Sequence, residues 1–179
     1  MGITQVLLAA WSLCLTLVVI GEMRIIGQLQ TSRPNRGENG LPVGSAVVGD
    51  IQATDLDSSQ MVSISPSGRP LVLILLQGSC SACRDFAGWF THAWESWLTV
   101  ADVALVCSGP AETVREFRRS FPESLDFFWD ADRRVASALK CHAAPFGFVL
   151  SEDGRVAAKA VVSRETSADT LLAALRTTR

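Results

Sequence analysis

The sequence lacks an excess of charge of either sign. Its 179 residues include 16 Lys and Arg against 18 Asp and Glu, a formal net charge of −2. A nucleic-acid-binding domain shows a basic excess or a basic stripe, so this balance argues against that class. With 48% hydrophobic residues and no internal repeat or low-complexity tract, the chain is neither disordered nor collagen-like. The length suits one domain with an appendage.

Side-chain charge is absent from the N-terminus. The first charged residue is Glu22, and residues 6–20 are almost entirely apolar. Because a helix rises about 1.5 Å per residue, residues 2–21 would span about 30 Å, the thickness of one hydrocarbon core. The positive n-region and the small-residue cleavage site of a signal peptide are lacking. We therefore expect residues 1–23 to be a single transmembrane anchor, with a cleaved signal peptide and a buried soluble helix as alternatives.

The sequence after residue 23 predicts a linker followed by a globular domain. Residues 31–45 are rich in Gly, Pro, Asn and Ser, which is typical of a linker. We expect a juxtamembrane segment and linker over 24–45 and a globular domain over 46–179. Three arginines between residues 24 and 36 would place this domain in the cytoplasm by the positive-inside rule. They are widely spaced, so charge alone leaves the orientation open.

The remaining sequence alternates between predicted strands and helices. Strands are predicted at 47–54, 61–64, 71–76, 103–107, 127–129, 146–150 and 156–162, and helices at 80–98, 111–120, 132–140 and 167–175. The unbroken apolar run 71–76 predicts a central strand buried on both faces. Helix 132–140 would have an acidic first turn and a basic last residue, and Ser167 is a predicted N-cap. This order predicts an α/β fold with a mixed sheet flanked by helices.

The motif C-S-A-C at residues 80–83 is the most informative pair of cysteines. It follows the predicted strand 71–76 and begins a helix. On a first helical turn, positions i and i+3 are neighbours, so the sulfurs of Cys80 and Cys83 can bridge. The free N–H groups and the helix dipole stabilise a thiolate at the first cysteine. We therefore predict a redox-active pair that exchanges with substrate disulfides.

The cysteine pair has two other interpretations. A zinc site would need a second Cys or His pair at similar spacing, which the sequence lacks. A purely structural disulfide is the other alternative.

Pro145 stands between a predicted helix and the strand 146–150. A proline there can be cis and leaves a backbone edge for an extended substrate; an ordinary loop proline is the alternative.

These residues together carry a family resemblance. Residues 71–150, with a buried strand, C-S-A-C, a helix and a proline before the next strand, resemble the thioredoxin superfamily. The hairpin-like lead-in over 46–64 resembles the TlpA/ResA-like branch of membrane-tethered disulfide reductases. The stretch 24–29 and the tail 146–165 resemble the MauD family of methylamine-utilisation accessory proteins.

The resemblance implies a thioredoxin-like fold behind a single N-terminal transmembrane helix. It implies that Cys80 is the attacking thiolate, Cys83 the resolving thiol, and Pro145, preceded by Ala144, the cis-proline beside them. The expected activity is thiol–disulfide exchange with protein disulfides or thiols, including a MauD-like maturation role. The expected location is the cytoplasmic (inner) membrane, with the domain facing the periplasm or cell exterior. Electrons would come from an integral-membrane thiol carrier.

The sequence also departs from this family. Ser81 stands where proline usually follows the first cysteine, and Ser79 where tryptophan is common. Ile74 occupies the position of the buried acid of thioredoxins, and Phe86 that of the glutamate of ResA-type reductases. No proton acceptor for Cys83 is evident nearby in the sequence, so the direction of electron transfer stays open.

Three further residues are auxiliary candidates. Cys107 ends a predicted strand, and Cys141 and His142 lie shortly before Pro145. Each cysteine could be a small apolar residue, half of a second disulfide, or an auxiliary exchange thiol. His142 could be a loop residue, a proton shuttle or a metal ligand. We expect no metal and no cofactor beyond the Cys80–Cys83 disulfide. The alternative functions are a copper-delivery module using Cys80, Cys83 and His142, and a non-catalytic assembly partner of a membrane complex.

Overall fold

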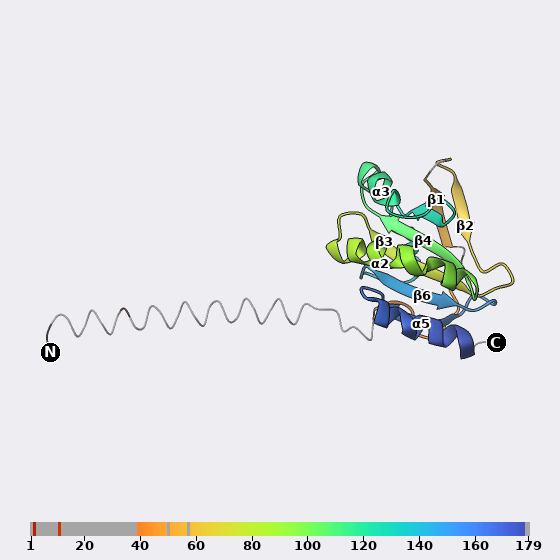
Figure 1. Ribbon diagram of the computed structural model, residues 1–179. Coiled ribbons are helices and arrows are strands. Elements are labelled where there is room, and N and C mark those ends of the chain that lie inside the picture. The colour runs from red at the N-terminus through yellow and green to blue at the C-terminus, as the bar shows by residue number, and fades with distance from the viewer. Residues whose placement is uncertain (1, 3–10, 12–38, 50, 57, 178–179) are drawn as a thin grey trace. The chain divides into compact units, whose positions relative to one another are not determined.

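The computed structural model describes residues 2, 11, 39–49, 51–56 and 58–177 (Figure 1). The chain divides into two compact units, Met1–Glu38 and Asn39–Arg179. The predicted anchor at 1–23, apart from Gly2 and Trp11, lies outside the described residues. No helix within the described part of the chain is long and apolar enough to cross a membrane.

The second unit is built on one seven-stranded sheet with the strand order β2-β1-β5-β4-β3-β6-β7. In chain order its elements are β1 (Ile51–Asp55), β2 (Met61–Ile64), β3 (Leu71–Gln77), α2 (Ser81–Leu98), β4 (Asp102–Ser108), α3 (Ala111–Arg118), β5 (Asp126–Trp129), α4 (Arg134–Ala138), β6 (Phe146–Leu150), β7 (Val156–Val161) and α5 (Glu165–Thr177). Strands β3, β4 and β5 pair in parallel, and the other pairs are antiparallel. The predicted mixed sheet flanked by helices is confirmed.

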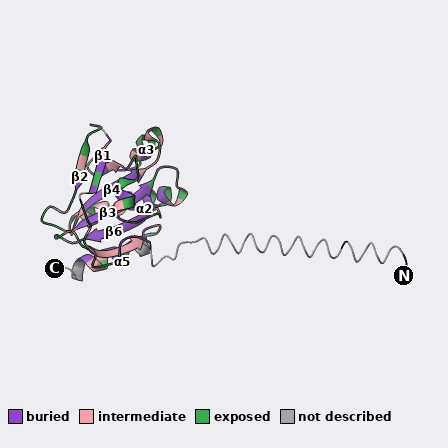
Figure 2. Ribbon diagram, turned by 180° about the vertical axis from the view of Figure 1, so that it is seen from behind, coloured by how far each residue is buried: buried purple, intermediate pink, exposed green. Residues whose placement is uncertain are grey.

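The central strands are buried on both faces, as the apolar run 71–76 predicts (Figure 2). Alternate residues of β3 enter two core clusters, because successive side chains of a strand point to opposite faces. Val72, Ile74 and Leu76 pack on the face covered by α2, α3 and α5. The opposite face is covered by α4 and by the segment around Leu41.

Helix α2 is fixed to the sheet by an aromatic stripe. Phe86, Phe90 and Trp97 are at most 1% exposed. The rings of Phe86 and Phe90 stack at 4.8 Å, and Phe90 meets Trp97 edge-to-face at 5.3 Å. Burying such large apolar side chains stabilises the helix strongly. The first turn of α2, which carries Cys83, is thereby held against the sheet.

Strand β1 begins at Ile51, not at residue 47 as the sequence predicts. Gly49 has a φ of 86°, and Val48 is 90% exposed. Within the described residues 39–49, strand pairing is limited to an isolated bridge between Ala46 and Arg155. The apolar residues at 47 and 48 therefore imitate a strand in the sequence without belonging to one.

Helix α4 is shorter than the predicted helix 132–140. Arg133 and Lys140 have φ values of 55° and 52°, outside the helical range, so the helix is confined to Arg134–Ala138. The carboxylate of buried Asp130 accepts hydrogen bonds from two backbone N–H groups of α4, both at 3.1 Å. Because α4 begins only at Arg134, Asp132 lies outside it, and the predicted acidic first turn is wrong. Ser167 is also not an N-cap, because α5 already begins at Glu165.

The compact domain begins before residue 46. Residues 39–45 were predicted as linker, but Gly40 N–H donates to the Lys140 carbonyl at 3.1 Å, and Leu41 N–H to that of Leu139 at 2.8 Å. Gly40 has a φ of 80°, and a Cβ there would lie 2.5 Å from a ring carbon of Phe148. Only glycine fits this approach without strain. The segment is thus part of the domain, and its turn residues resemble a linker only in composition.

Candidate active site

The C-S-A-C motif lies where β3 gives way to α2. Cys80 is the N-cap of α2, with extended backbone angles of φ −82° and ψ 125°, and Cys83 lies in the first turn. The Cys80 N–H donates to the Gln77 carbonyl at 3.1 Å, which closes the turn between strand and helix. Cys80 is half-buried, whereas Cys83 is fully buried. A protein partner can therefore reach Cys80, whereas Cys83 is shielded from solvent.

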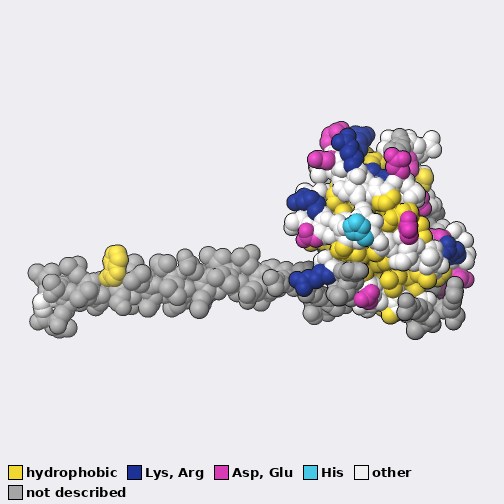
Figure 3. Space-filling model, viewed as in Figure 1, with side chains coloured by type: hydrophobic (Ala, Val, Ile, Leu, Met, Phe, Trp, Pro, Cys, Tyr) yellow, Lys and Arg dark blue, Asp and Glu magenta, His cyan; other side chains and the backbone are white. Residues whose placement is uncertain are grey.

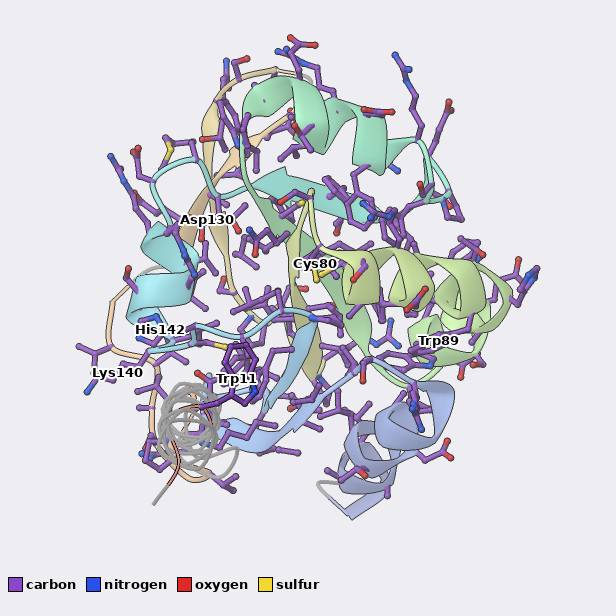
Figure 4. All side chains as sticks on the ribbon, turned by 90° about the vertical axis from the view of Figure 1, so that its left-hand side faces the viewer. Trp11, Cys80, Trp89, Asp130, Lys140 and His142 are labelled. Atoms are coloured by element: carbon purple, nitrogen blue, oxygen red, sulfur yellow. The ribbon has the colours of Figure 1, made fainter. Side chains whose placement is uncertain are left out.

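The start of α2 presents partial positive charge to Cys80. The first N–H groups of a helix have no intrahelical partner and form the positive end of its dipole. The first turn of α2 contains no acidic residue that would offset this charge. Figure 4 shows Cys80 at this end of the helix. The half-buried Cys80 side chain therefore lies at the positive end of the α2 dipole.

Cys83 has the opposite environment. Its side chain is 0% exposed, and its Sγ accepts one hydrogen bond from the Gln77 N–H at 3.4 Å. Burial raises the pKa of the Cys83 thiol; the Gln77 N–H lowers it, and the neighbouring Cys80 and Cys107 sulfurs raise it further. Cys83 is therefore a neutral thiol at physiological pH. None of these influences on its pKa comes from a carboxylate, which agrees with the apolar Ile74 and Phe86 in the same core cluster.

The loop before β6 completes the site. The Ala144–Pro145 peptide bond is cis, as the resemblance implies. The Sγ of Cys80 donates to the Ala144 carbonyl at 3.7 Å. The structure therefore brings together the four residues predicted as the site core, Cys80, Cys83, Ala144 and Pro145, although 64 sequence positions separate Cys80 from Ala144.

Asn39 is a residue of this region that sequence reasoning missed. Its side-chain amide donates to Cys141 Sγ at 3.3 Å, and its Oδ1 accepts the backbone N–H of His142 at 3.0 Å. Asn39 is only 7% exposed and fixes the loop that leads to Ala144. The sequence held no signal for this role, because an Asn-Gly pair in a polar stretch reads as linker.

The two auxiliary cysteines, Cys107 and Cys141, lie on opposite faces of the sheet. Cys107 lies at the end of β4 on the α2 side of the sheet, whereas Cys141 lies in the core on the opposite face. Cys80, Cys83, Cys107 and Cys141 are free thiols, so the second disulfide left open by the sequence is not formed. Burial raises the pKa of Cys107 to about 12 and also raises that of Cys141.

His142 is an exposed loop residue, and Figure 4 shows it apart from Cys80. It does not join the two motif cysteines in one cluster. Within the described ranges, no three His, Cys, Asp or Glu side chains gather in a group that could hold a metal ion. The donor set that a copper site at Cys80, Cys83 and His142 would need is therefore not brought together.

The face of the domain seen in Figure 3 carries charges of both signs. In the view of Figure 3, acidic and basic side chains are interspersed over the domain, with apolar side chains exposed between them. The ion pair between Arg69 and Asp102, at 3.1 Å, joins the two signs directly before β3 and at the start of β4. This face shows no extended basic area, in keeping with the balanced composition.

Comparison with known proteins shows the fold. No family model matches the sequence, and no curated protein matches it. Similar solved structures include peroxidoxin BcpB from Mycobacterium tuberculosis, with 20% identity, a TM-score of 0.62, and coverage of 78% of this chain and 99% of that one. The thioredoxin domain of a thiol-disulfide oxidoreductase from Bacteroides vulgatus has 17% identity, a TM-score of 0.61, and coverage of 76% and 97%. MTB DsbF has 18% identity, a TM-score of 0.59, and coverage of 73% and 96%. The chain therefore has a thioredoxin-like fold.

Proposed function

We propose that this protein is a thiol–disulfide oxidoreductase that acts on protein disulfides through Cys80 and Cys83. One observation carries the proposal: an accessible cysteine at a helix N-terminus and a buried cysteine one turn later lie beside a cis-proline loop. The similar structures named as a thiol-disulfide oxidoreductase and as DsbF support it, since they share this fold.

The exchange proceeds in two displacements. The Cys80 thiolate attacks one sulfur of a substrate disulfide, and the other substrate sulfur leaves as a thiolate that takes a proton from solvent. Cys83 then attacks the Cys80 sulfur of the mixed disulfide and releases the second substrate sulfur, to which the Cys83 proton passes. The substrate is reduced by two electrons, and a Cys80–Cys83 disulfide remains. The reverse sequence would oxidise a substrate dithiol.

Burial divides the roles of the two sulfurs. The raised pKa of Cys83 keeps it protonated until the mixed disulfide forms, so it does not compete for the substrate. The cis-proline loop would align an extended segment of the substrate next to Cys80, because the backbone carbonyl of Ala144 already lies at its Sγ.

Trapping of a mixed disulfide tests this division of roles between Cys80 and Cys83. The Cys83→Ala variant, treated with oxidised glutathione, should retain one glutathione on Cys80, because no second thiol resolves the mixed disulfide. The wild type should release it, and the Cys80→Ala variant should acquire none at this site. Intact-mass spectrometry before and after dithiothreitol measures the adduct. Equal labelling of the two variants would contradict the assigned roles.

We further propose that residues 1–23 anchor the protein in the cytoplasmic membrane, with the domain on the outer side. The uncharged run 2–21 supports the anchor, and the resemblance to membrane-tethered reductases of the TlpA/ResA type supports the side. The electron donor would be an integral-membrane thiol carrier, and a MauD-like maturation role is one specific form of this function. An impermeant maleimide should label Cys80 in intact spheroplasts. Labelling only after permeabilisation would refute the outward orientation.

A further inference from the structure

A third cysteine, Cys107, belongs to the same core cluster as Cys83. Strands β3 and β4 run in parallel, with Leu76 in register with Cys107. Neighbouring strands lie roughly 5 Å apart. The next residue along β3, Gln77, donates its N–H to Cys83 Sγ at 3.4 Å. Cys83 is therefore held over the end of β3 at the level where β4 carries Cys107.

Both sulfurs face the same side of the sheet. Leu76, Cys83 and Cys107 all belong to the core cluster covered by α2, and the two cysteines are 0% exposed. The Cys107 Sγ has one hydrogen-bond partner, the Ser108 carbonyl at 3.7 Å. The sulfur of Cys107 is also among the causes that raise the pKa of Cys83. Two buried thiols thus share one core cluster, against which the half-buried Cys80 packs.

We propose that Cys107 is a third redox thiol, which exchanges into the oxidised motif to form a buried Cys83–Cys107 disulfide and to free Cys80. The Cys107 sulfur attacks the Cys83 sulfur of the Cys80–Cys83 disulfide, the bond between Cys80 and Cys83 breaks, and the proton of Cys107 passes to Cys80. One disulfide replaces another, so no oxidant is consumed. The proposal rests on the proposed function only for the source of the first disulfide.

The environment of each sulfur sets the rate and the consequence of this step. Burial raises the pKa of Cys107 to about 12, so little of Cys107 is thiolate at neutral pH and the exchange is slow. The leaving group, Cys80, sits at the positive end of α2, which favours its departure. The domain would then hold a disulfide in its interior while Cys80 is again free to engage a second partner.

Tryptic peptides separate the two disulfides. The chain has no cleavable Lys or Arg bond between residues 37 and 84, because Arg69 precedes a proline, and none between 85 and 115. A Cys80–Cys83 disulfide stays within peptide 37–84. A Cys83–Cys107 disulfide links peptides 37–84 and 85–115. Cys141 falls in a third peptide, 141–155, and serves as an internal control.

The decisive sample is the full-length Cys80→Ser variant oxidised with diamide, which converts two thiols into a disulfide without help from Cys80. We expect the linked pair 37–84/85–115 as the main product, and its loss in the Cys80→Ser/Cys107→Ala variant. Absence of the linked pair in Cys80→Ser would overturn the proposal, and so would linkage of peptide 141–155 at equal yield. In the wild type, an internal disulfide in 37–84 without the linked pair would overturn this inference while leaving the proposed function intact.

Discussion

The Asn39→Ala substitution tests whether one side chain fixes the loop before the cis-proline. Asn39 is 7% exposed and makes two side-chain hydrogen bonds, to Cys141 Sγ at 3.3 Å and from the His142 N–H at 3.0 Å. Alanine removes both. The bonds from the Lys159 ammonium to the carbonyls of Asn39 and Gly40, at 2.9 Å each, involve only backbone oxygens and are retained.

The size of the effect follows from these partners. A typical hydrogen bond contributes about 1 kcal/mol net, and a donor left without a partner in the interior costs about 1–3 kcal/mol. The His142 N–H is only partly buried, so water replaces part of what it loses. The bond to sulfur is weaker than one to oxygen. We therefore expect Asn39→Ala to lower the free energy of unfolding by about 2 kcal/mol.

Urea unfolding of the full-length chain, followed by tryptophan fluorescence, measures this change. The midpoint should fall while the m-value stays the same, because the surface exposed on unfolding is unchanged. The matched control is His142→Ala, which removes an exposed side chain but keeps the backbone N–H that Asn39 binds. A change within about 0.5 kcal/mol for Asn39→Ala, or an equal loss for the control, would refute this reasoning.

Three further predictions concern stability. Burial raises the pKa of Cys107 from 9.0 to about 12, so the folded state keeps a proton that the unfolded state releases, and stability falls as pH rises through this window. Urea titrations should show Cys107→Ala relieving about 1 kcal/mol of the loss between pH 9 and pH 10. Gly40 and Gly154 both have a positive φ, which strains an alanine, but only at Gly40 would the added Cβ meet the Phe148 ring. Gly40→Ala should therefore lower the free energy of unfolding by about 1–3 kcal/mol more than Gly154→Ala in thermal denaturation. Equal losses would contradict the ring contact. Asp130→Ala removes both hydrogen bonds that the carboxylate accepts from the N–H groups of α4 and should lower the free energy of unfolding by about 1–2 kcal/mol; an unchanged urea midpoint would contradict this role.

The sequence predicted those parts of the fold whose patterns are local. The apolar run at 71–76 forms the buried strand β3, and the motif at 80–83 lies at the start of α2, as the local patterns predict. The errors fall where distant contacts decide. The first N–H groups of α4 donate to Asp130, which lies outside the helix, and the predicted linker at 39–45 is fixed by residues about a hundred positions away.

By itself, the sequence determined the order of the elements, the reactive pair Cys80 and Cys83, and Pro145 as the proline of the neighbouring loop. These follow from hydrophobic periodicity and from the chemistry of two thiols one helical turn apart. Only the tertiary structure decided how exposed each sulfur is and which groups surround it. It placed Cys107 on the side of Cys83, Cys141 on the other side, and Asn39 at the loop before Ala144. Side-chain partners across a sheet depend on register and on the face each residue occupies, and no short stretch of sequence contains that information.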